Sequence, residues 1–255
     1  MGATIKAAKK HWRLWPMAVI DTETTGLHSE QGDRIVELAV VRFEEGVPVS
    51  RWGLLLDPEM KLPPDTTRIT GIRPEEVEGQ PRFAEVAATL LEKLEGCLLV
   101  AYNVPFDRGF LLHELARAGS SLPAGSTWLD PLVFVKEMQR GQGSMRLGTV
   151  AKRIGIPLLE AHRATADAEC AGLVLQSLAV DLPEDLGEVL DLQEQWEAKQ
   201  NAERAGWRGQ RRERRVAGSA PLELDGPRNS LGAGYPHGDE LDPVRYMFLR
   251  RAGRG

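Results

Sequence analysis

Apolar and polar positions in the first part of the chain follow the two-residue period of β-strands. The apolar run at 17–20 ends at Asp21 and indicates a central strand. Two further strand-like runs, 34–43 and 47–56, are separated by a Glu-Glu-Gly sequence that is typical of a hairpin turn. The pattern therefore predicts three consecutive antiparallel strands, the last two of which form a hairpin.

From residue 83 onward the pattern alternates between helical and strand-like periods. Residues 83–94 carry apolar side chains at helical spacing, and the all-apolar run 97–101 that follows indicates a buried parallel strand. The pattern then predicts a helix at 105–118, a short strand at 128–129 and helices at 131–139, 146–154 and 165–179. This order predicts an α/β fold, a mixed sheet of about five strands flanked by helices.

The character of the sequence changes after residue 182. Residues 184–197 hold six acidic residues and no basic one, whereas residues 198–215 hold seven basic residues. An acidic start and a basic end complement a helix dipole, so we expect a helix over 183–206. Six glycines and three prolines at 208–239 then predict a mostly disordered, basic and Gly/Pro-rich tail over 207–255.

Composition and charge narrow the function classes. The chain has 255 residues, 42% of them hydrophobic, and a formal net charge of −5, to which residues 14–182 contribute 16 − 24 = −8. This negative charge argues against a domain that binds nucleic acid through a broad basic face. It is compatible with acidic side chains that converge on a cation. The alternative is an acidic surface that is simply solvated. Two cysteines, and no signal peptide or membrane-spanning run, predict a cytoplasmic protein with no membrane association.

The first chemical motif is Asp-Thr-Glu-Thr-Thr-Gly-Leu at 21–27. On a strand, positions two apart project to the same side, so Asp21 and Glu23 face one point near the end of the strand. Two carboxylates so close repel each other unless a cation or a proton lies between them, and Mg²⁺ and Mn²⁺ prefer such oxygen ligands. Taken alone, the pair is more typical of two solvated acids in a turn.

Two further motifs follow predicted elements. Asn-Val-Pro-Phe-Asp at 103–107 lies after the buried strand, at the strand end where open α/β sheets place their sites. His-Arg-Ala-Thr-Ala-Asp at 162–167 places His162 on a loop, Thr165 as a helix cap and Asp167 in the first helical turn. Singly, each motif is also compatible with an ordinary helix start.

Together the three motifs resemble the DEDDh branch of the DEDD 3′–5′ exonuclease superfamily, and most closely its group similar to the proofreading epsilon subunit of bacterial DNA polymerase III. The stretches 34–39, 70–72 and 147–151 are similar as well, and the resemblance covers about residues 17–180. One departure is Tyr102, where many relatives have His. The resemblance implies a ribonuclease-H-like exonuclease domain over residues 14–182.

The resemblance also implies the site residues. Two divalent cations, Mg²⁺ or Mn²⁺, would be held by four carboxylates, with Asp21 bridging them and His162 accepting a proton from the attacking water. The implied metal ligands are Asp21, Glu23, Asp107 and Asp167. The implied substrate-binding residues are Thr24, Thr25, Leu27, Asn103 and Phe106.

The function expected from this resemblance is release of nucleoside 5′-monophosphates from nucleic-acid 3′ ends, with single-stranded or frayed DNA favoured over RNA, in proofreading or repair. The alternatives are an RNA-trimming exonuclease, a phosphodiesterase acting on small molecules, and a nuclease-fold module that recruits partners. A DNA polymerase or repair protein that binds the C-terminal tail is a further hypothesis.

Overall fold

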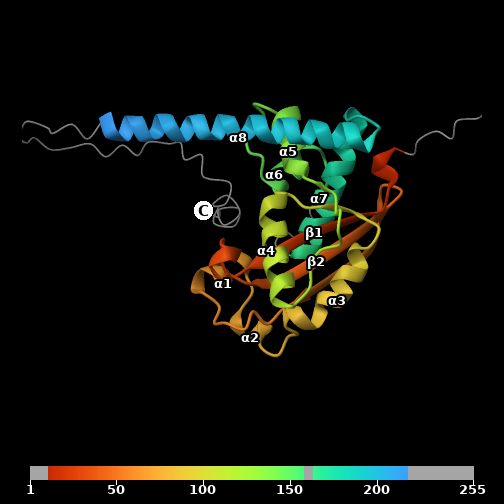
Figure 1. The fold of residues 1–255 in the computed structure, drawn as a ribbon, viewed down its shortest axis with the longest axis vertical. Helices are drawn as coiled ribbons and strands as arrows, with labels where there is room; N and C mark the ends of the chain where they lie inside the picture. The colour runs from red at the N-terminus through yellow and green to blue at the C-terminus, as the bar shows by residue number, and fades with distance from the viewer. Residues whose placement is uncertain (1–10, 158–162, 218–255) are drawn as a thin grey trace, which may run out of the picture.

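The computed structural model describes residues 11–157 and 163–217 (Figure 1). Within them, five strands form one mixed sheet in the order β3-β2-β1-β4-β5. The strands are β1 (Met17–Thr24), β2 (Ile35–Glu44), β3 (Val47–Leu55), β4 (Leu98–Val100) and β5 (Trp128–Leu129). The β1–β2 and β2–β3 pairs are antiparallel, whereas β1–β4 and β4–β5 are parallel. The predicted mixed sheet is therefore confirmed.

The hairpin between β2 and β3 turns at the last two of the three residues that the sequence indicated, since Glu44 still belongs to β2. Glu45 and Gly46 both have positive φ angles, 51° and 82°. Two successive left-handed residues give the turn whose twist matches that of paired strands. This hairpin extends the sheet on the side of β1 away from β4.

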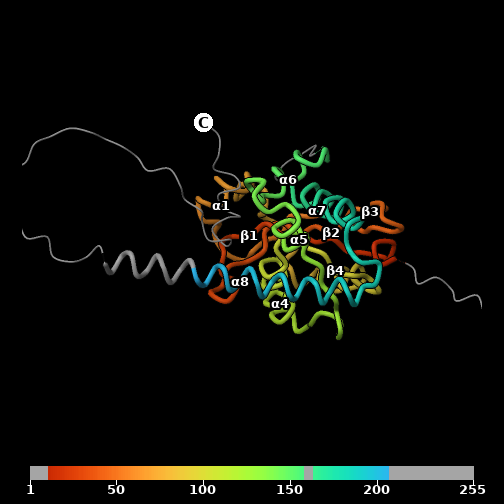
Figure 2. Tube along the Cα trace, turned by 90° about the horizontal axis from the view of Figure 1, so that it is seen from above, coloured from red at the N-terminus to blue at the C-terminus, as the bar shows by residue number. Residues whose placement is uncertain are grey.

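Helices cover both faces of the sheet. They are α1 (Pro64–Thr70), α2 (Pro74–Val77), α3 (Phe83–Leu94), α4 (Val104–Arg117), α5 (Pro131–Met138), α6 (Leu147–Arg153), α7 (Ala164–Leu178) and α8 (Leu186–Ala217). Figure 2 shows α7 on one side of the strands and α4 on the opposite side. The short helices α1 and α2 were not predicted, whereas α3 to α7 were.

Strand alternation divides the core into two layers. Met17 and Val19 belong to the apolar cluster that includes α5, α6 and α7 residues. Ala18 and Ile20 belong to the cluster that includes α3 and α4 residues. Because side chains alternate along a strand, the odd-numbered positions of β1 face α7 and the even-numbered positions face α4.

The last helix, α8, is longer than predicted. It begins at Leu186 and continues past the expected end at 206 to Ala217, so residues 207–217 are helical rather than disordered. Its first half packs on the domain, where Val189 is fully buried and Trp196 contacts Phe134 edge to face. The rest of the predicted tail, 218–255, lies outside the described residues. No helix in the described part of the chain is long and apolar enough to cross a membrane.

Candidate active site

The site begins on β1, where an apolar strand ends in carboxylates. All eight residues of β1 are buried, including Asp21 at 4% and Glu23 at 8% exposure. Both carboxylates occupy odd-numbered positions, so they continue the face on which Met17 and Val19 pack beneath α7. The predicted common orientation of Asp21 and Glu23 is therefore confirmed.

The helix α7 approaches this face closely because two glycines leave room for it. A Cβ atom at Gly172 of α7 would lie 2.5 Å from the Phe43 ring of β2. A Cβ atom at Gly53 of β3 would lie 2.2 Å from Oγ1 of Thr165. The helix begins at Ala164, so Thr165 is not its cap and its side chain lies against β3 instead. The first turn of α7 thus rests on the sheet beside the β1 carboxylates.

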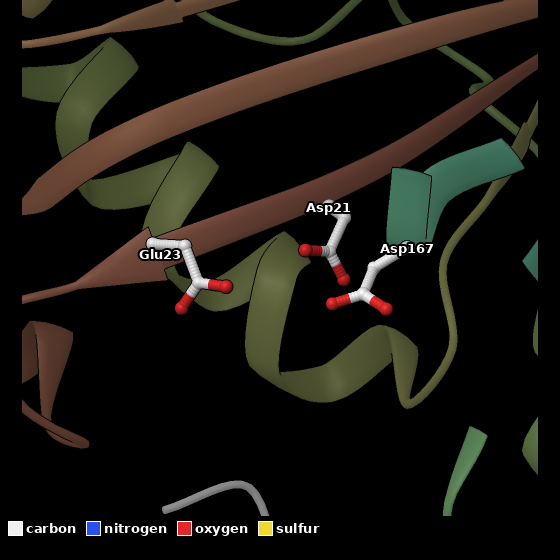
Figure 3. A group of neighbouring side chains, drawn as sticks. All are labelled: Asp21, Glu23 and Asp167. Atoms are coloured by element: carbon white, nitrogen blue, oxygen red, sulfur yellow. The ribbon is translucent and has the colours of Figure 1, made fainter. Parts of the chain in front are cut away.

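Asp167 in that first turn completes a group of three carboxylates. Asp21, Glu23 and Asp167 each offer an oxygen atom within 4.8 Å of the others, and all three residues are buried. Figure 3 shows the β1 side chains and the α7 side chain directed into one space. A hard divalent cation such as Mg²⁺ or Mn²⁺ fits this set, because carboxylate oxygens are its preferred ligands and its charge offsets their repulsion.

Asp107 reaches the same strand from the start of α4. It lies in the first turn of α4 and is fully buried. Its Oδ1 accepts hydrogen bonds from the backbone N–H of Thr22 at 2.9 Å and from the Thr22 hydroxyl at 2.8 Å. Asp107 therefore contacts the residue between Asp21 and Glu23 but is not part of the three-carboxylate group. Its assignment as a fourth metal ligand stays a prediction.

A buried carboxylate fixes the turn that carries Asn103. Asn103 has a left-handed φ of 84°, and its N–H and that of Val104 donate to Oδ1 and Oδ2 of Asp130 at 2.9 and 3.0 Å. Burial raises the pKa of Asp130 to about 6, against the lowering effect of these backbone hydrogen bonds. Phe106 lies one turn further along α4 and packs against Phe110. Asp130 was missed because its partners are distant in sequence, although Asp before Pro131 is a recognisable helix cap.

The loop after β1 is held by side-chain contacts to its own backbone. The Thr24 hydroxyl donates to the carbonyl of Gly26 at 2.6 Å. The Thr25 hydroxyl accepts the N–H of Arg34 at 2.9 Å, and the Thr25 carbonyl accepts the hydroxyl of Thr66 of α1 at 2.8 Å. A Cβ atom at Gly26 would lie 2.2 Å from the carboxylate of Asp33, so a larger residue would displace that carboxylate from its hydrogen bonds to Thr25 and His28. The loop that presents Leu27 is therefore fixed at both ends.

An ion pair ties this loop to α4. The Arg34 guanidinium donates through Nε and one terminal nitrogen to the two carboxylate oxygens of Glu114, at 2.7 and 3.0 Å. Glu114 is 2% exposed and also accepts the N–H of Ile35. Two-point pairs of this kind fix geometry as well as charge. The pair links the loop after β1 to the helix that carries Phe106 and Asp107, and sequence reasoning missed it.

His162, the predicted proton acceptor, lies outside the described residues. The description resumes at Arg163, whose side chain meets β2 at Glu37. Burial raises the pKa of the Glu37 carboxyl, and the positive charge of Arg163 opposes that rise. The role of His162 therefore stays a prediction.

Comparisons with known proteins agree with this architecture. The sequence profile of the exonuclease family matches residues 18–175. The chain is 33% identical over 156 residues to the 3′-5′ exonuclease DinG of Bacillus subtilis, which covers 61% of this chain and 17% of that protein. It is 34% identical over 150 residues to the DNA polymerase III subunit epsilon of Treponema pallidum, covering 58% of this chain and 69% of that subunit.

Solved structures share the fold. Exonuclease X in complex with 5′ overhanging duplex DNA aligns with a TM-score of 0.57 at 21% identity, over 69% of this chain and 99% of that one. Escherichia coli exonuclease I in complex with a dT13 oligonucleotide aligns with a TM-score of 0.56 at 21% identity, over 64% and 41%. At this identity the likeness concerns the ribonuclease-H-like fold alone. The chain belongs to the exonuclease family, because the profile of that family matches more than half of the chain.

Proposed function

We propose that this protein is a metal-dependent 3′–5′ exonuclease that releases nucleoside 5′-monophosphates from single-stranded or frayed DNA 3′ ends. The observation that carries the proposal is the buried group formed by Asp21, Glu23 and Asp167. Three buried carboxyl groups within 4.8 Å of one another repel strongly when ionised, and binding of cations relieves that repulsion. The names of the relatives, a 3′-5′ exonuclease and a polymerase subunit, support the direction and the substrate.

The chain's own residues have distinct tasks in this reaction. Asp21, Glu23 and Asp167, with Asp107 as the proposed fourth ligand, would hold two Mg²⁺ or Mn²⁺ ions. When bound, such ions offset the negative charge of the scissile phosphate and lower the pKa of a water molecule. An imidazole nitrogen of His162 would accept the proton of that water, since a histidine with an ordinary pKa is largely neutral at pH 7. The hydrogen bonds of Asp107 to Thr22 hold α4 against β1.

The neighbouring loops would bind the terminal nucleotide. Thr24 ends β1 and Thr25 begins the fixed loop after it, and their backbone and hydroxyl groups are candidates for contacts to the terminal sugar and phosphate. Leu27, partly exposed, would contact the terminal base, and Asn103 and Phe106 would contact it from the start of α4. An apolar and an aromatic side chain suit single-stranded ends, because their bases are free to unstack.

The substrate is tested by degradation rates on matched single-stranded DNA, duplex DNA with a frayed 3′ end, and RNA. The proposal predicts faster degradation of both DNA substrates than of RNA, and loss of activity in Asp21→Ala. Faster degradation of RNA would favour the exoribonuclease alternative. Binding without any hydrolysis in the presence of Mg²⁺ or Mn²⁺ would instead favour a recruitment module.

The C-terminal tail, residues 207–255, is the proposed attachment for a polymerase or repair partner. Figure 1 shows α8 crossing α5 and continuing past the edge of the domain. Its first half belongs to the fold, since Gln193 bonds to β5 and Lys199 to Glu137 of α5. A truncation that tests the tail should therefore end after residue 206, not after 182. Equal activity and equal partner binding of 1–206 and the full chain would refute this attachment.

A further inference from the structure

A buried carboxylate beside the three-carboxylate group holds an exposed arginine. Glu37 of β2 is the cross-strand neighbour of Glu23 and is 2% exposed. Its Oε1 accepts the Nε–H of Arg163 at 3.1 Å, and its Oε2 accepts the N–H of Ala164 at 3.4 Å. The carboxylate thereby fixes both the side chain of Arg163 and the first residue of α7.

This contact uses only part of the guanidinium. A guanidinium has five N–H donors, and Glu37 engages the one on Nε. The side chain of Arg163 is 62% exposed, and Glu37 is its one hydrogen-bonded carboxylate among the residues that the structure describes. The two terminal nitrogens, which form the forked end that matches a phosphate, are therefore presented at the surface.

The position of Arg163 relates it to the site on two sides. Its carbonyl accepts the N–H of Asp167 at 3.0 Å, so it lies one helical turn from that member of the three-carboxylate group. Its partner Glu37 lies directly across the β1–β2 ladder from Glu23, another member. Arg163 therefore places a positive charge next to the three-carboxylate group, in a domain whose residues 14–182 carry a net charge of −8.

We propose that Arg163 binds a backbone phosphate of the substrate strand next to the three-carboxylate group, with Glu37 as the residue that orients its guanidinium. The inference rests on the proposed function and adds a phosphate contact to it. A strand that approaches an acidic domain needs a fixed positive charge where its backbone passes, and arginine supplies two parallel N–H donors to a phosphate. Orientation by Glu37 lowers the entropy lost when that contact forms.

The test is the salt dependence of binding. Affinity of the full chain for a fluorescein-labelled oligo-dT strand is measured by anisotropy in CaCl₂, with gels confirming that the strand stays intact, between about 50 and 200 mM salt. Arg163→Gln retains a donor for Glu37 but removes the positive charge, and Arg163→Lys retains the charge but not the fork. The matched control is Arg42→Gln, because Arg42 of β2 also bonds through Nε to a carboxylate, that of Glu44. Arg42 pairs with Ala18 near the start of β1, whereas the three-carboxylate group lies near the end of that strand.

The expected result is specific to a phosphate contact. Arg163→Gln should bind roughly tenfold more weakly at low salt, the size of one charge-assisted hydrogen bond. Its slope of log affinity against log salt should be shallower by about 0.7, the value for one phosphate contact on a single strand. Arg163→Lys should keep the wild-type slope with weaker binding, and Arg42→Gln should match the wild type in both.

Three results would contradict the inference or its basis. An unchanged slope in Arg163→Gln, or an equal decrease in Arg42→Gln, would overturn the phosphate contact while leaving the proposed function intact. A wild-type protein that neither binds nor degrades the strand in Mg²⁺ would instead contradict the proposed function. Thermal unfolding of each variant well above the assay temperature confirms that the comparison concerns folded protein.

Discussion

Replacing Asp167 by asparagine should stabilise the protein when no metal is present. The side chain keeps its size and loses its charge, so the packing of α7 on the sheet is preserved. Asp21 and Glu23 then face one neutral amide instead of a third carboxylate. The structure gives the magnitude of this change.

The repulsion that is removed follows from the spacing of the three carboxylates. At 4.8 Å and an effective dielectric constant of about 20, each ionised pair repels by roughly 3.5 kcal/mol. The substitution removes two of the three pairs, although counterions and small movements of the side chains already relieve part of their repulsion. Asp167 also interacts favourably with the start of α7, worth about 0.3–1 kcal/mol. We expect a net stabilisation of about 2–3 kcal/mol, a rise in Tm of roughly 4–12 °C.

Thermal unfolding in EDTA and in Mn²⁺ measures both consequences. In EDTA the Asp167→Asn variant should melt above the wild type, and in Mn²⁺ it should show little of the metal-induced rise that the wild type shows. Asp65→Asn is the matched control, because Asp65 lies in the first turn of α1 but is 74% exposed. The reasoning would be refuted if Asp167→Asn melted below Asp65→Asn in EDTA and still showed the full Mn²⁺-induced rise in Tm of the wild type.

Three further predictions concern proton transfer, packing and pH. His162→Ala should lower kcat by about 10²-fold or more while the Mn²⁺-induced rise in Tm remains; a wild-type kcat between about pH 6 and 9 would assign the proton transfer to another group. Gly172→Ala should lower the free energy of unfolding in urea by about 1–3 kcal/mol, because its Cβ would lie 2.5 Å from the Phe43 ring, whereas Gly206→Ala, with nothing within 4 Å, should raise it by up to about 1 kcal/mol; equal effects would contradict the close packing of α7. The pKa of Asp130 is raised from 3.8 to about 6, so the folded protein holds this proton more tightly than the unfolded chain, and stability should fall by about 3 kcal/mol as the pH rises from about 4 to about 6. Urea midpoints of Asp130→Asn across this range should lack that decrease, and identical profiles for variant and wild type would show that another group titrates.

Local patterns predicted the parts of the site that depend on neighbouring residues. The common orientation of Asp21 and Glu23 follows from the two-residue period of a strand and needs no tertiary information. The bounds of α3, 83–94, follow from apolar spacing and agree with the structure. Asp167 in the first turn of α7 was expected from the same local argument, although the helix begins two residues earlier than a Thr165 cap would give.

The contacts that hold the site together connect residues distant in sequence. Asp130 binds the N–H groups of Asn103 and Val104, and Glu114 binds Arg34, yet nothing in the local sequence of either pair specifies its partner. Asp107 meets β1 at Thr22, between Asp21 and Glu23, although 85 residues separate the two partners in the sequence. The sequence order of helices and strands does not state which face a helix covers.

The end of α8 could not be predicted from glycine and proline content. The six glycines and three prolines at 208–239 favoured disorder after residue 206, but α8 continues to Ala217. A glycine inside a helix costs only about 1 kcal/mol, which the flanking arginine, glutamine and alanine residues offset through their helix propensity. The short helices α1 and α2 were not predicted, because four to seven residues are too few to show the helical period of apolar side chains.

The most direct test of the proposed function follows the products of one reaction. A single-stranded DNA oligonucleotide labelled at its 5′ end is incubated with the full chain in Mg²⁺ or Mn²⁺, and products are resolved by length while released nucleotides are identified. The account predicts a ladder that shortens one nucleotide at a time from the 3′ end, release of nucleoside 5′-monophosphates, and no products in EDTA or with Asp21→Ala. Internal cleavage, shortening from the 5′ end, or equal activity in EDTA and in Asp21→Ala would contradict it.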